Sequence, residues 1–584
     1  MGQIAAILSL GLLTLPEQSK RTKLHMETPD LATTSVITKP DYRLTAVIVG
    51  LLLLALFSHL NRIPLRAEEP RRALVAQEMK LSGNYIAPTI NGVYYYNKPP
   101  LYNWLLLMLY RLLGSSAEWV VRLPSVLSVL LLGWLHYWVM RRHTDEKTAL
   151  LSALFYMCSA DILFYFSLLG EIDLFYTLLV YAQVIAMFHF YQSRHYGRMF
   201  AVSYFFAALG VLTKGLPSLL FQAFTGLALL AAGRKWRLLF SWQHLAGMAV
   251  LLLITGGYFY LYNLQNNVSL YFAKLLSEST ERTVMEKGWG KQVLFFLQFP
   301  VILLKLLSPF VILLPFTLHR NMWQAIKTQP ALRFSGLFIA ANIWVYWLSP
   351  GTKDRYLYMF LPFFFTLLAY AWIHFGNLLP RFKKATGYMP GIMAAILALA
   401  SAATAVLPQT QPVPFILVKA LLFTLLFTLI WFIWRQQKFD NLLLLVLCTI
   451  LLRMEFNTTI IPLQIPVFTA DAALPQLDKI LEITNRQPVY LAGHAQNLHV
   501  KTFALGGKPL VETDIMQPPP LLFRISYYLT RATGHIVQYS PTTEPGKFYL
   551  ADAAFAAEKK LPVLYSFTEP RTQITYSLCR IEPK

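Results

Sequence analysis

The segment EEPRRALVAQEMKLSGNYIAPTINGVYYYNKPP, residues 68–100, follows an apolar stretch that begins near Leu44. It concentrates acids, arginines and tyrosines between stretches that are almost wholly apolar. Because charged side chains are costly in lipid, they gather in loops or at functional positions. A charged, aromatic loop held between membrane segments therefore indicates a site, and we expect residues 61–119 to form the first external loop.

The composition around this loop is that of a membrane protein. The 584-residue chain is 56% hydrophobic and only 14% charged, too apolar for a soluble globule. Its 51 Lys+Arg against 29 Asp+Glu give a formal net charge of +22. The basic residues fall in short clusters between apolar runs, so the positive-inside rule explains them and nucleic acid is not an expected partner.

Apolar runs long enough to cross a bilayer as helices recur along the chain. They begin near Leu44, Val120, Thr148, Leu174, Met199, Leu216, Leu245, Val293, Phe334, Tyr356, Met389, Pro414 and Asn441, which predicts about thirteen spans. Alternating them puts six basic loops on the cytoplasmic side: 140–143, 194–198, 233–237, 319–323, 380–384 and 435–438. This topology treats the short apolar run 101–113 as a juxtamembrane helix in the interface.

The chain is expected to divide into three parts. Residues 1–43 form a polar N-terminal tail, residues 44–461 the transmembrane domain, and residues 462–584 an external soluble α/β domain. In the last part ALPQLDKILEI has helical spacing, whereas PVYLAG, KFYLADA, VLYSF and QITYSLCRI are typical of short strands. Three widely spaced cysteines, Cys158, Cys448 and Cys579, indicate neither a disulfide framework nor a Cys-based metal site.

Two adjacent acids, Glu68 and Glu69, stand just past the first span, where Pro70 suits the first turn of a helix. One interpretation is that they only complement a helix dipole. The other is that one of them is a general base for an attacking hydroxyl or binds the substrate. The residues alone leave both readings open.

Further charges fall on the same predicted external face. Glu171 and Asp173 stand where one apolar helix ends and the next begins, and Lys214 interrupts an apolar stretch. Ionisable groups near membrane depth are usually functional. The alternatives are that the acids face water in a tight turn and that the lysine snorkels to the interface.

Cations on an external face run against the positive-inside bias, so they favour an anionic partner such as phosphate or pyrophosphate. Lys98, Lys353 and Arg355 are such cations, and ion pairing with nearby acids is the plain alternative. Tyr95 and Tyr96 are expected either to stack on a sugar or to belong to an interfacial aromatic belt.

The order of these motifs resembles the first external loop of lipid A aminoarabinose transferases and the wider protein O-mannosyltransferase-like group. The matching elements are Glu68-Glu69-Pro70-Arg71, Ala76-Gln77-Glu78-Met79, Ser82-Gly83-Asn84-Tyr85, Asn91-Gly92 and Lys98-Pro99-Pro100-Leu101. Asp173, Thr213-Lys214-Gly215 and the turn 353–355 resemble later landmarks, so the likeness covers roughly residues 44–380.

The resemblance implies an α-helical polytopic membrane protein of the GT-C fold, located in the plasma (inner) membrane with its active site on the external, periplasmic side. It would transfer a sugar from a polyprenyl-phosphate donor to a glycolipid, glycan or protein acceptor. Glu68 matches the position of the family's catalytic acid, usually Asp, with Asp173 as the second acid. The implied donor or substrate contacts are Glu69, Arg71, Lys98, Lys214, Lys353, Arg355, Tyr95 and Tyr96.

Two other classes of function stay open from the residues. A transporter or lipid flippase would line a pathway with its charges, but these charges gather at one face. A non-catalytic scaffold would use the C-terminal domain to bind a partner. No P-loop or dinucleotide motif stands in useful context. A divalent metal shared by Glu68, Asp173 and the donor phosphate is compatible with the residues, although no ligand spacing demands it.

Overall fold

A computed structural model describes residues 40–280, 289–494, 496–501, 504–505, 508–509, 512–517, 523–570 and 573–582. The chain is mostly helical, with strands confined to one loop hairpin and the C-terminal part. The helices of the membrane domain are α2 Tyr42–Phe57, α3 Glu69–Ser82, α4 Leu101–Leu112, α5 Glu118–Met140, α6 Glu146–Met157, α7 Ala160–Phe164, α8 Ile172–Gln192, α9 Tyr196–Lys214, α10 Pro217–Ala232, α11 Trp242–Asn263, α12 Val268–Thr280, α14 Trp289–Leu306, α15 Leu314–Thr317, α16 Arg320–Thr328, α17 Pro330–Trp347, α18 Leu361–Phe375, α19 Pro380–Ala403, α20 Ile416–Arg435, α21 Asn441–Glu455 and α22 Ile461–Asp471.

Each apolar run expected to cross the membrane coincides with a helix or a broken pair of helices. Among the described residues, eight helices are long and apolar enough to span a bilayer, or up to ten if each bent pair counts as one. The expected number of about thirteen is therefore not confirmed: two of the expected runs are bent pairs of helices, α2 and α10 are shorter apolar helices, and α17 is not among the candidate spans. The protein is a multi-pass helical membrane protein.

Local chemistry sets where these helices begin. The side chain of Asp41 accepts hydrogen bonds from two backbone N–H groups at the start of α2, and Asp145 and Asp440 each accept one at the starts of α6 and α21. Such caps satisfy donors that the first helical turn leaves unpaired. At the other end of α3, Gly83 takes a left-handed conformation with φ of 72°, which favours glycine.

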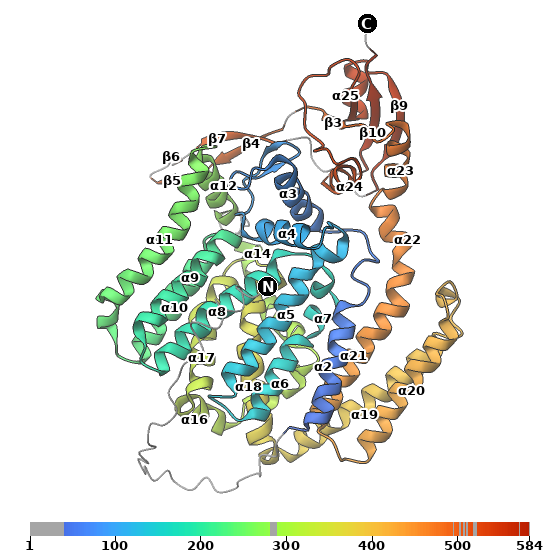
Figure 1. Ribbon diagram of the computed structural model, residues 1–584. Helices are drawn as coiled ribbons and strands as arrows, with labels where there is room; N and C mark the ends of the chain where they lie inside the picture. Colours follow the sequence, from blue (N-terminus) through green and yellow to red (C-terminus); the bar gives the residue numbers. More distant parts are fainter. Residues whose placement is uncertain are drawn as a thin grey trace. The chain divides into compact units, whose positions relative to one another are not determined.

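The loop after α2 carries α3, the short hairpin β1 Thr89–Ile90 with β2 Val93–Tyr94, and α4 (Figure 1). The 12-residue α4 occupies the run that we expected to be too short to span, and it packs between α3 and α5. Residues of α3 and α4 share one buried apolar cluster with the C-terminal sheet. The loop is therefore part of a packed structure over the end of the helix bundle.

The C-terminal part contains a four-stranded sheet in the order β3-β8-β10-β9. Strand β3, Val489–Ala492, pairs in parallel with β8, Phe548–Asp552, while β10, Thr575–Arg580, lies antiparallel to β8 and to β9, Val563–Thr568. These four strands and helix α23, Leu474–Ile483, confirm the expected elements. The sequence did not predict α24 Phe523–Thr533, α25 Ala553–Glu558, or the small pairs β4 Gln496–Lys501 with β7 Glu512–Gln517 and β5 Ala504–Leu505 with β6 Lys508–Pro509.

Helix α24 joins the C-terminal part to the first loop. The Tyr528 hydroxyl accepts a hydrogen bond from the backbone N–H of Leu65 at 2.9 Å and donates to Glu118 at 3.0 Å. Asn91 donates to the Ser526 hydroxyl at 2.8 Å. Because the partners lie more than 400 residues apart in the chain, these contacts hold the two ends of the sequence together. The predicted boundary after residue 461 falls at the start of α22, which continues the candidate span from α21, and it stays a prediction.

Candidate functional site

A polar cavity of about 250 Å³ opens where α3, α8, α9 and the turn before α18 meet. Its walls carry seven cations and three carboxylates, a formal surplus of four positive charges. The charged lining residues are Glu68, Arg71, Arg72, Lys98, Glu171, Asp173, Lys214, Lys274, Lys353 and Arg355, with Asn97, Ile172 and Tyr356 between them. Such a concentration of cations can neutralise an anion with more than one negative charge.

The structure brings seven of the ten predicted site residues to this one cavity. They are Glu68, Arg71, Lys98, Asp173, Lys214, Lys353 and Arg355. Glu69, Tyr95 and Tyr96 do not line it. The sequence reasoning missed Arg72, Asn97, Lys274 and Tyr356 as lining residues, and it noted Glu171 without choosing it as a site residue.

Glu68 stands at the N-terminus of α3, with its carboxylate at the edge of the cavity. Its Oε2 lies 2.8 Å from the Arg71 guanidinium, and the Glu68 side chain is 37% exposed. An exposed ion pair of this kind is weak, so it can open when another group competes. Glu68 is therefore the carboxylate of this cavity that solvent and a hydroxyl group can reach.

Glu171 and Asp173 are far less exposed, and both are paired. Asp173 Oδ1 lies 2.5 Å from the Lys214 ammonium at the end of α9, and its Oδ2 lies 3.4 Å from Arg355 Nε. Arg355 also pairs with Glu171 at 2.5 Å. Burial raises the pKa of Glu171 to about 7, and the neighbouring Arg355 cation opposes this rise. These four side chains form an ion-pair network that connects α8, α9 and the turn before α18.

Lys214 is positioned by aromatic rings as well as by its carboxylate. Its Nζ lies 4.1 Å from the centre of the Tyr356 ring and 5.1 Å from that of Tyr176. A cation over an aromatic face is attracted to the ring's negative face. Lys98 donates to the Asn97 carbonyl at 2.9 Å, just before α4 begins. Lys274 of α12 and Lys353 have no carboxylate within ion-pair distance among the residues that the structure describes.

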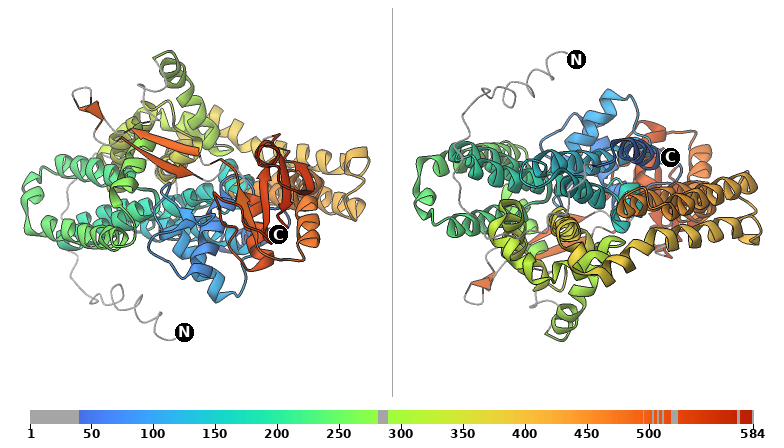
Figure 2. Two further views of the ribbon diagram at one scale, coloured as in Figure 1. Left: turned by 90° about the horizontal axis from the view of Figure 1, so that it is seen from above. Right: turned by 90° about the horizontal axis from the view of Figure 1, so that it is seen from below.

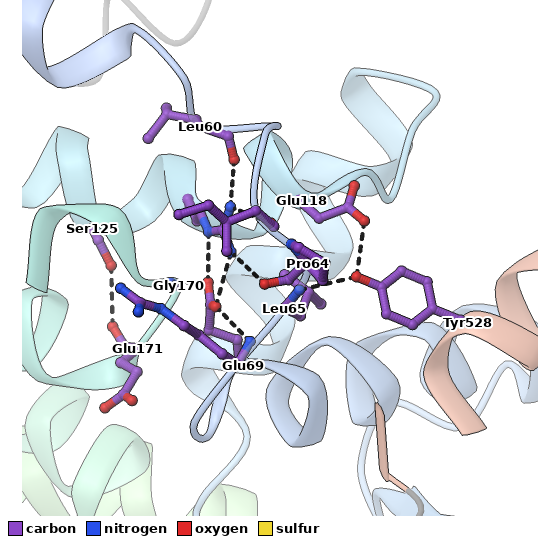
Figure 3. A network of polar contacts seen from close by, with 12 residues as sticks. Leu60, Pro64, Leu65, Glu69, Glu118, Ser125, Gly170, Glu171 and Tyr528 are labelled. Carbon is purple, nitrogen blue, oxygen red and sulfur yellow. Dashed lines mark hydrogen bonds and ion pairs between the residues drawn. The ribbon is translucent and has the colours of Figure 1, made fainter. Parts of the chain in front are cut away.

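Glu69 points away from the cavity and is fully buried. Both of its oxygens are occupied: Arg122 donates to them at 2.8 and 3.1 Å, the Gly170 N–H at 2.7 Å, and the Arg66 N–H at 2.9 Å (Figure 3). Arg122 also donates to three loop carbonyls, those of Leu60, Ile63 and Pro64. Glu69 is therefore a structural residue behind the cavity wall, and the structure does not support the predicted contact between Glu69 and the substrate.

The two predicted tyrosines also lie behind the cavity wall. The Tyr95 hydroxyl accepts a hydrogen bond from Arg72, which places that guanidinium at the cavity. Tyr96 accepts a hydrogen bond from Asn266 at 2.9 Å and packs against Tyr271. Neither residue lines the cavity, so both fit a supporting role better than sugar stacking.

A metal site does not emerge from the described part of the chain. It contains no group of three or more His, Cys, Asp or Glu side chains placed to hold a metal ion. The sharing of a divalent cation by Glu68, Asp173 and a donor phosphate stays a prediction.

The fold and this charged cavity define a class, the membrane proteins of the GT-C fold. Over 93% of its length the chain superposes on the whole of ArnT from Cupriavidus metallidurans bound to undecaprenyl phosphate, with a TM-score of 0.65 and 17% sequence identity. The apo crystal structure of the same protein gives a TM-score of 0.64. These likenesses confirm the expected fold.

Sequence comparisons point to particular relatives. Residues 97–258 match the family model described as dolichyl-phosphate-mannose-protein mannosyltransferase. The chain is 29% identical over 189 residues to an undecaprenyl phosphate-alpha-4-amino-4-deoxy-L-arabinose arabinosyl transferase of Pseudomonas aeruginosa, covering 32% of this chain and 34% of that one. It is 37% identical over 128 residues to the second such transferase of Pseudomonas fluorescens, covering 22% and 21%. The matches thus span about a third or less of these relatives, and they confirm the resemblance noted in the sequence.

Proposed function

We propose that this protein is an integral-membrane glycosyltransferase that moves a sugar from a polyprenyl-phosphate donor to an acceptor in the charged cavity. The observation that carries the proposal is the cavity itself, where seven cations surround an accessible carboxylate at the ends of membrane helices. The similarity to aminoarabinose transferases that are named for an undecaprenyl phosphate donor supports the same donor class here.

The cations suit the charge that develops when the donor breaks down. Cleavage of a sugar–phosphate bond leaves positive charge on the sugar ring and negative charge on the departing phosphate. Lys274 and Lys353 lack a carboxylate partner among the described residues, and Arg71 holds only an exposed one. These three side chains can therefore turn to the phosphate, where fixed positive charge stabilises the transition state.

Glu68 is the residue proposed to accept the proton of the acceptor hydroxyl. It is the exposed carboxylate of the cavity, and a general base must reach the proton that it removes. The related position usually carries Asp in the family that the sequence resembles. Glu places its carboxylate one methylene farther from the backbone, so the acceptor is expected to sit farther from α3 than it would with Asp.

Asp173, Lys214, Glu171 and Arg355 are proposed to hold the cavity in shape. Each already has a partner of opposite charge in the network, and three of the four side chains are less than 10% exposed. Removing one partner of a buried pair leaves an uncompensated charge, which is strongly unfavourable. Asp173 would thereby fix Lys214 beside the reacting groups.

The cavity is proposed to face the external, periplasmic side of the inner membrane. The six basic loops named from the sequence alternate to the opposite ends of the helices, as the positive-inside rule expects for cytoplasmic loops. The acceptor is then an envelope molecule with a reactive hydroxyl, such as a lipid A-like glycolipid, a glycan or a protein.

The proposal is tested by transfer of radiolabelled sugar from polyprenyl-phosphate donors in membranes that carry the full-length protein. Glu68→Gln is expected to lower transfer by a factor of about 10² or more, as loss of a general base does. Glu558→Gln makes the same chemical change at an exposed acid far from the cavity and should leave transfer intact. Equal transfer by the Glu68→Gln protein, at equal amounts of folded protein, would contradict the assigned role.

The same assay tests the other predictions. Transfer lost in EDTA and restored by Mg²⁺ would support a shared metal, whereas unchanged transfer would contradict it. If no donor from a broad panel is consumed by the intact protein, the transferase proposal fails. Lipid movement across the bilayer would then be measured, because the flippase class predicts translocation without cleavage.

A further inference from the structure

A second cavity, of about 610 Å³, lies at the other end of the bundle, and we call it the basal pocket. It is formed by the end of α18, the start of α19, the end of α20 and the start of α21. The residues used below are Trp372, Lys383, Lys384, Trp434, Arg435 and Asn441. None of them belongs to the charged cavity described above.

The two cavities lie at opposite ends of one candidate span, residues 354–378. Arg355 at the start of this span lines the charged cavity, and Trp372 near its end lines the basal pocket. A helical segment of this length is on the order of 35 Å long, close to the thickness of a bilayer. The basal pocket therefore lies at the membrane surface opposite the charged cavity.

The lining of the basal pocket is positively charged. Lys383, Lys384 and Arg435 line it, and no carboxylate does so among the described residues. Asp440, the nearest acid in sequence to this lining, is engaged with Lys147 at 2.5 Å. Three cations without a lining acid attract an anion, and a phosphodiester is the anion that membrane surfaces present in quantity.

A buried hydrogen-bond acceptor, the side-chain oxygen of Asn441, is a second feature of the basal pocket that favours a ligand. The Oδ1 atom of Asn441 is buried and has no hydrogen-bond partner among the described residues. An unpaired polar atom in a protein interior is unfavourable, so a ligand that pairs with it gains binding free energy. Beside it, the Trp434 ring is held in place by a hydrogen bond to the Gly387 carbonyl at 2.8 Å. Rotation of the Asn441 side chain, which lines the pocket, would present its side-chain oxygen to a head group that carries a hydroxyl donor.

The helices that leave the pocket expose apolar side chains along their length. Ile392, Ile396 and Leu399 of α19 are 50–74% exposed, and residues of α20 such as Leu425 are exposed as well. Figure 2 shows α19 and α20 side by side at one edge of the bundle in both views. In a membrane this edge faces acyl chains, so a ligand with its phosphate in the pocket would lay its chains along α19 and α20.

We propose that the basal pocket binds the head group of an anionic phospholipid with a hydroxyl donor, such as phosphatidylglycerol, in the leaflet opposite the charged cavity. Lys383, Lys384 and Arg435 would bind the phosphodiester, Asn441 would accept from the head-group hydroxyl, and Trp372 and Trp434 would pack on the glycerol backbone. The bound lipid would anchor the α19–α20 hairpin. The inference does not depend on the transferase activity.

Native mass spectrometry of the full-length protein in detergent tests this proposal. Phosphatidylglycerol, phosphatidylcholine and inorganic phosphate are each titrated against the protein, and bound adducts are counted. We expect saturable binding of phosphatidylglycerol, at least tenfold weaker binding of phosphatidylcholine, and no phosphate adduct. The combined variant Lys383→Ala, Lys384→Ala and Arg435→Ala should weaken phosphatidylglycerol binding at least tenfold.

A matched variant controls for general loss of positive charge. Arg198, Arg237 and Arg320 are exposed and lie in other basic loops, so their combined change to Ala removes the same charge away from the pocket. It should leave phosphatidylglycerol binding within twofold of the wild type. Equal loss in both variants, or no loss in the pocket variant, would overturn the proposal. Phosphate binding that matches lipid binding would overturn the lipid assignment and indicate a site for a free anion.

Discussion

The contrast between Glu69 and Glu68 gives a sharp test of how the site is built. The same change, Glu to Gln, is made at two adjacent positions. Glu69 is fully buried and accepts four hydrogen bonds, two of them from Arg122, whereas the Glu68 side chain is 37% exposed and pairs with Arg71. We therefore expect Glu69→Gln to lower stability and Glu68→Gln to lower transfer.

The magnitude follows from the donors that surround Glu69. A Gln side chain offers one oxygen, which can keep two of the four donors, while its amide group meets the other two. Each donor left unpaired costs about 1–3 kcal/mol, and a buried ion pair broken on one side costs about 3–5 kcal/mol. Two unpaired donors and one broken ion pair therefore both predict that the free energy of unfolding falls by about 4 kcal/mol. The exposed pair at Glu68 contributes about 0.2–1 kcal/mol.

The assay is thermal unfolding of the purified protein in detergent, followed by tryptophan fluorescence and by the monodisperse fraction that remains after heating. Glu69→Gln should lower the midpoint by several degrees, and Glu68→Gln should leave it within about 1 °C of the wild type. Transfer per folded molecule should show the reverse order. A Glu69→Gln protein as stable as the wild type would refute the role given to the Arg122 pair.

Three further changes test the frame of the site. Gly170→Ala would put a Cβ 2.4 Å from a backbone carbonyl of α5 and should destabilise the fold by about 1–3 kcal/mol in thermal unfolding, whereas Gly257→Ala, with open space around it, should not. Tyr528→Phe leaves the Leu65 N–H unpaired, so limited proteolysis should cut the first loop faster. An unchanged rate of cleavage would show that this hydrogen bond does not hold the first loop to α24. Burial raises the pKa of Glu78 to about 7, so the folded protein holds a proton that the unfolded chain releases above about 4.5. The free energy of unfolding should therefore fall as pH rises from about 4.5 to 7. If the Glu78→Gln variant shows the same pH dependence of stability, Glu78 is not the group responsible.

Much of the site could be predicted because its charges interrupt apolar sequence. Asp173 and Lys214 stand out for that reason, Glu68 and Arg355 stand out as charges on the predicted external face, and the structure places all four at one cavity. Lys274 could not be chosen in this way, because nothing in the sequence shows that α12 folds back to the cavity.

The different places of Glu68 and Glu69 lay beyond the sequence as well. Successive helical residues point about 100° apart, so one acid can face the cavity while its neighbour faces the interior. Which of them does so depends on where Arg122 of α5 lies, and Arg122 is the one arginine of a mostly apolar helix that carries no motif. In the same way, Tyr96 is turned from the cavity by its contact with Asn266, which lies 170 residues away.

The contacts between the first loop and α24 have a consequence for biosynthesis. Leu65 and Asn91 leave the ribosome early, but their partners Tyr528 and Ser526 are 463 and 435 residues farther along the chain. Contacts of such separation form late, because the intervening chain must be made and inserted first. In a nascent protein the first loop therefore lacks its contacts with α24 until translation is nearly complete. Chains that stop before α24 would therefore lack the hydrogen bonds that Tyr528 and Ser526 make to the first loop.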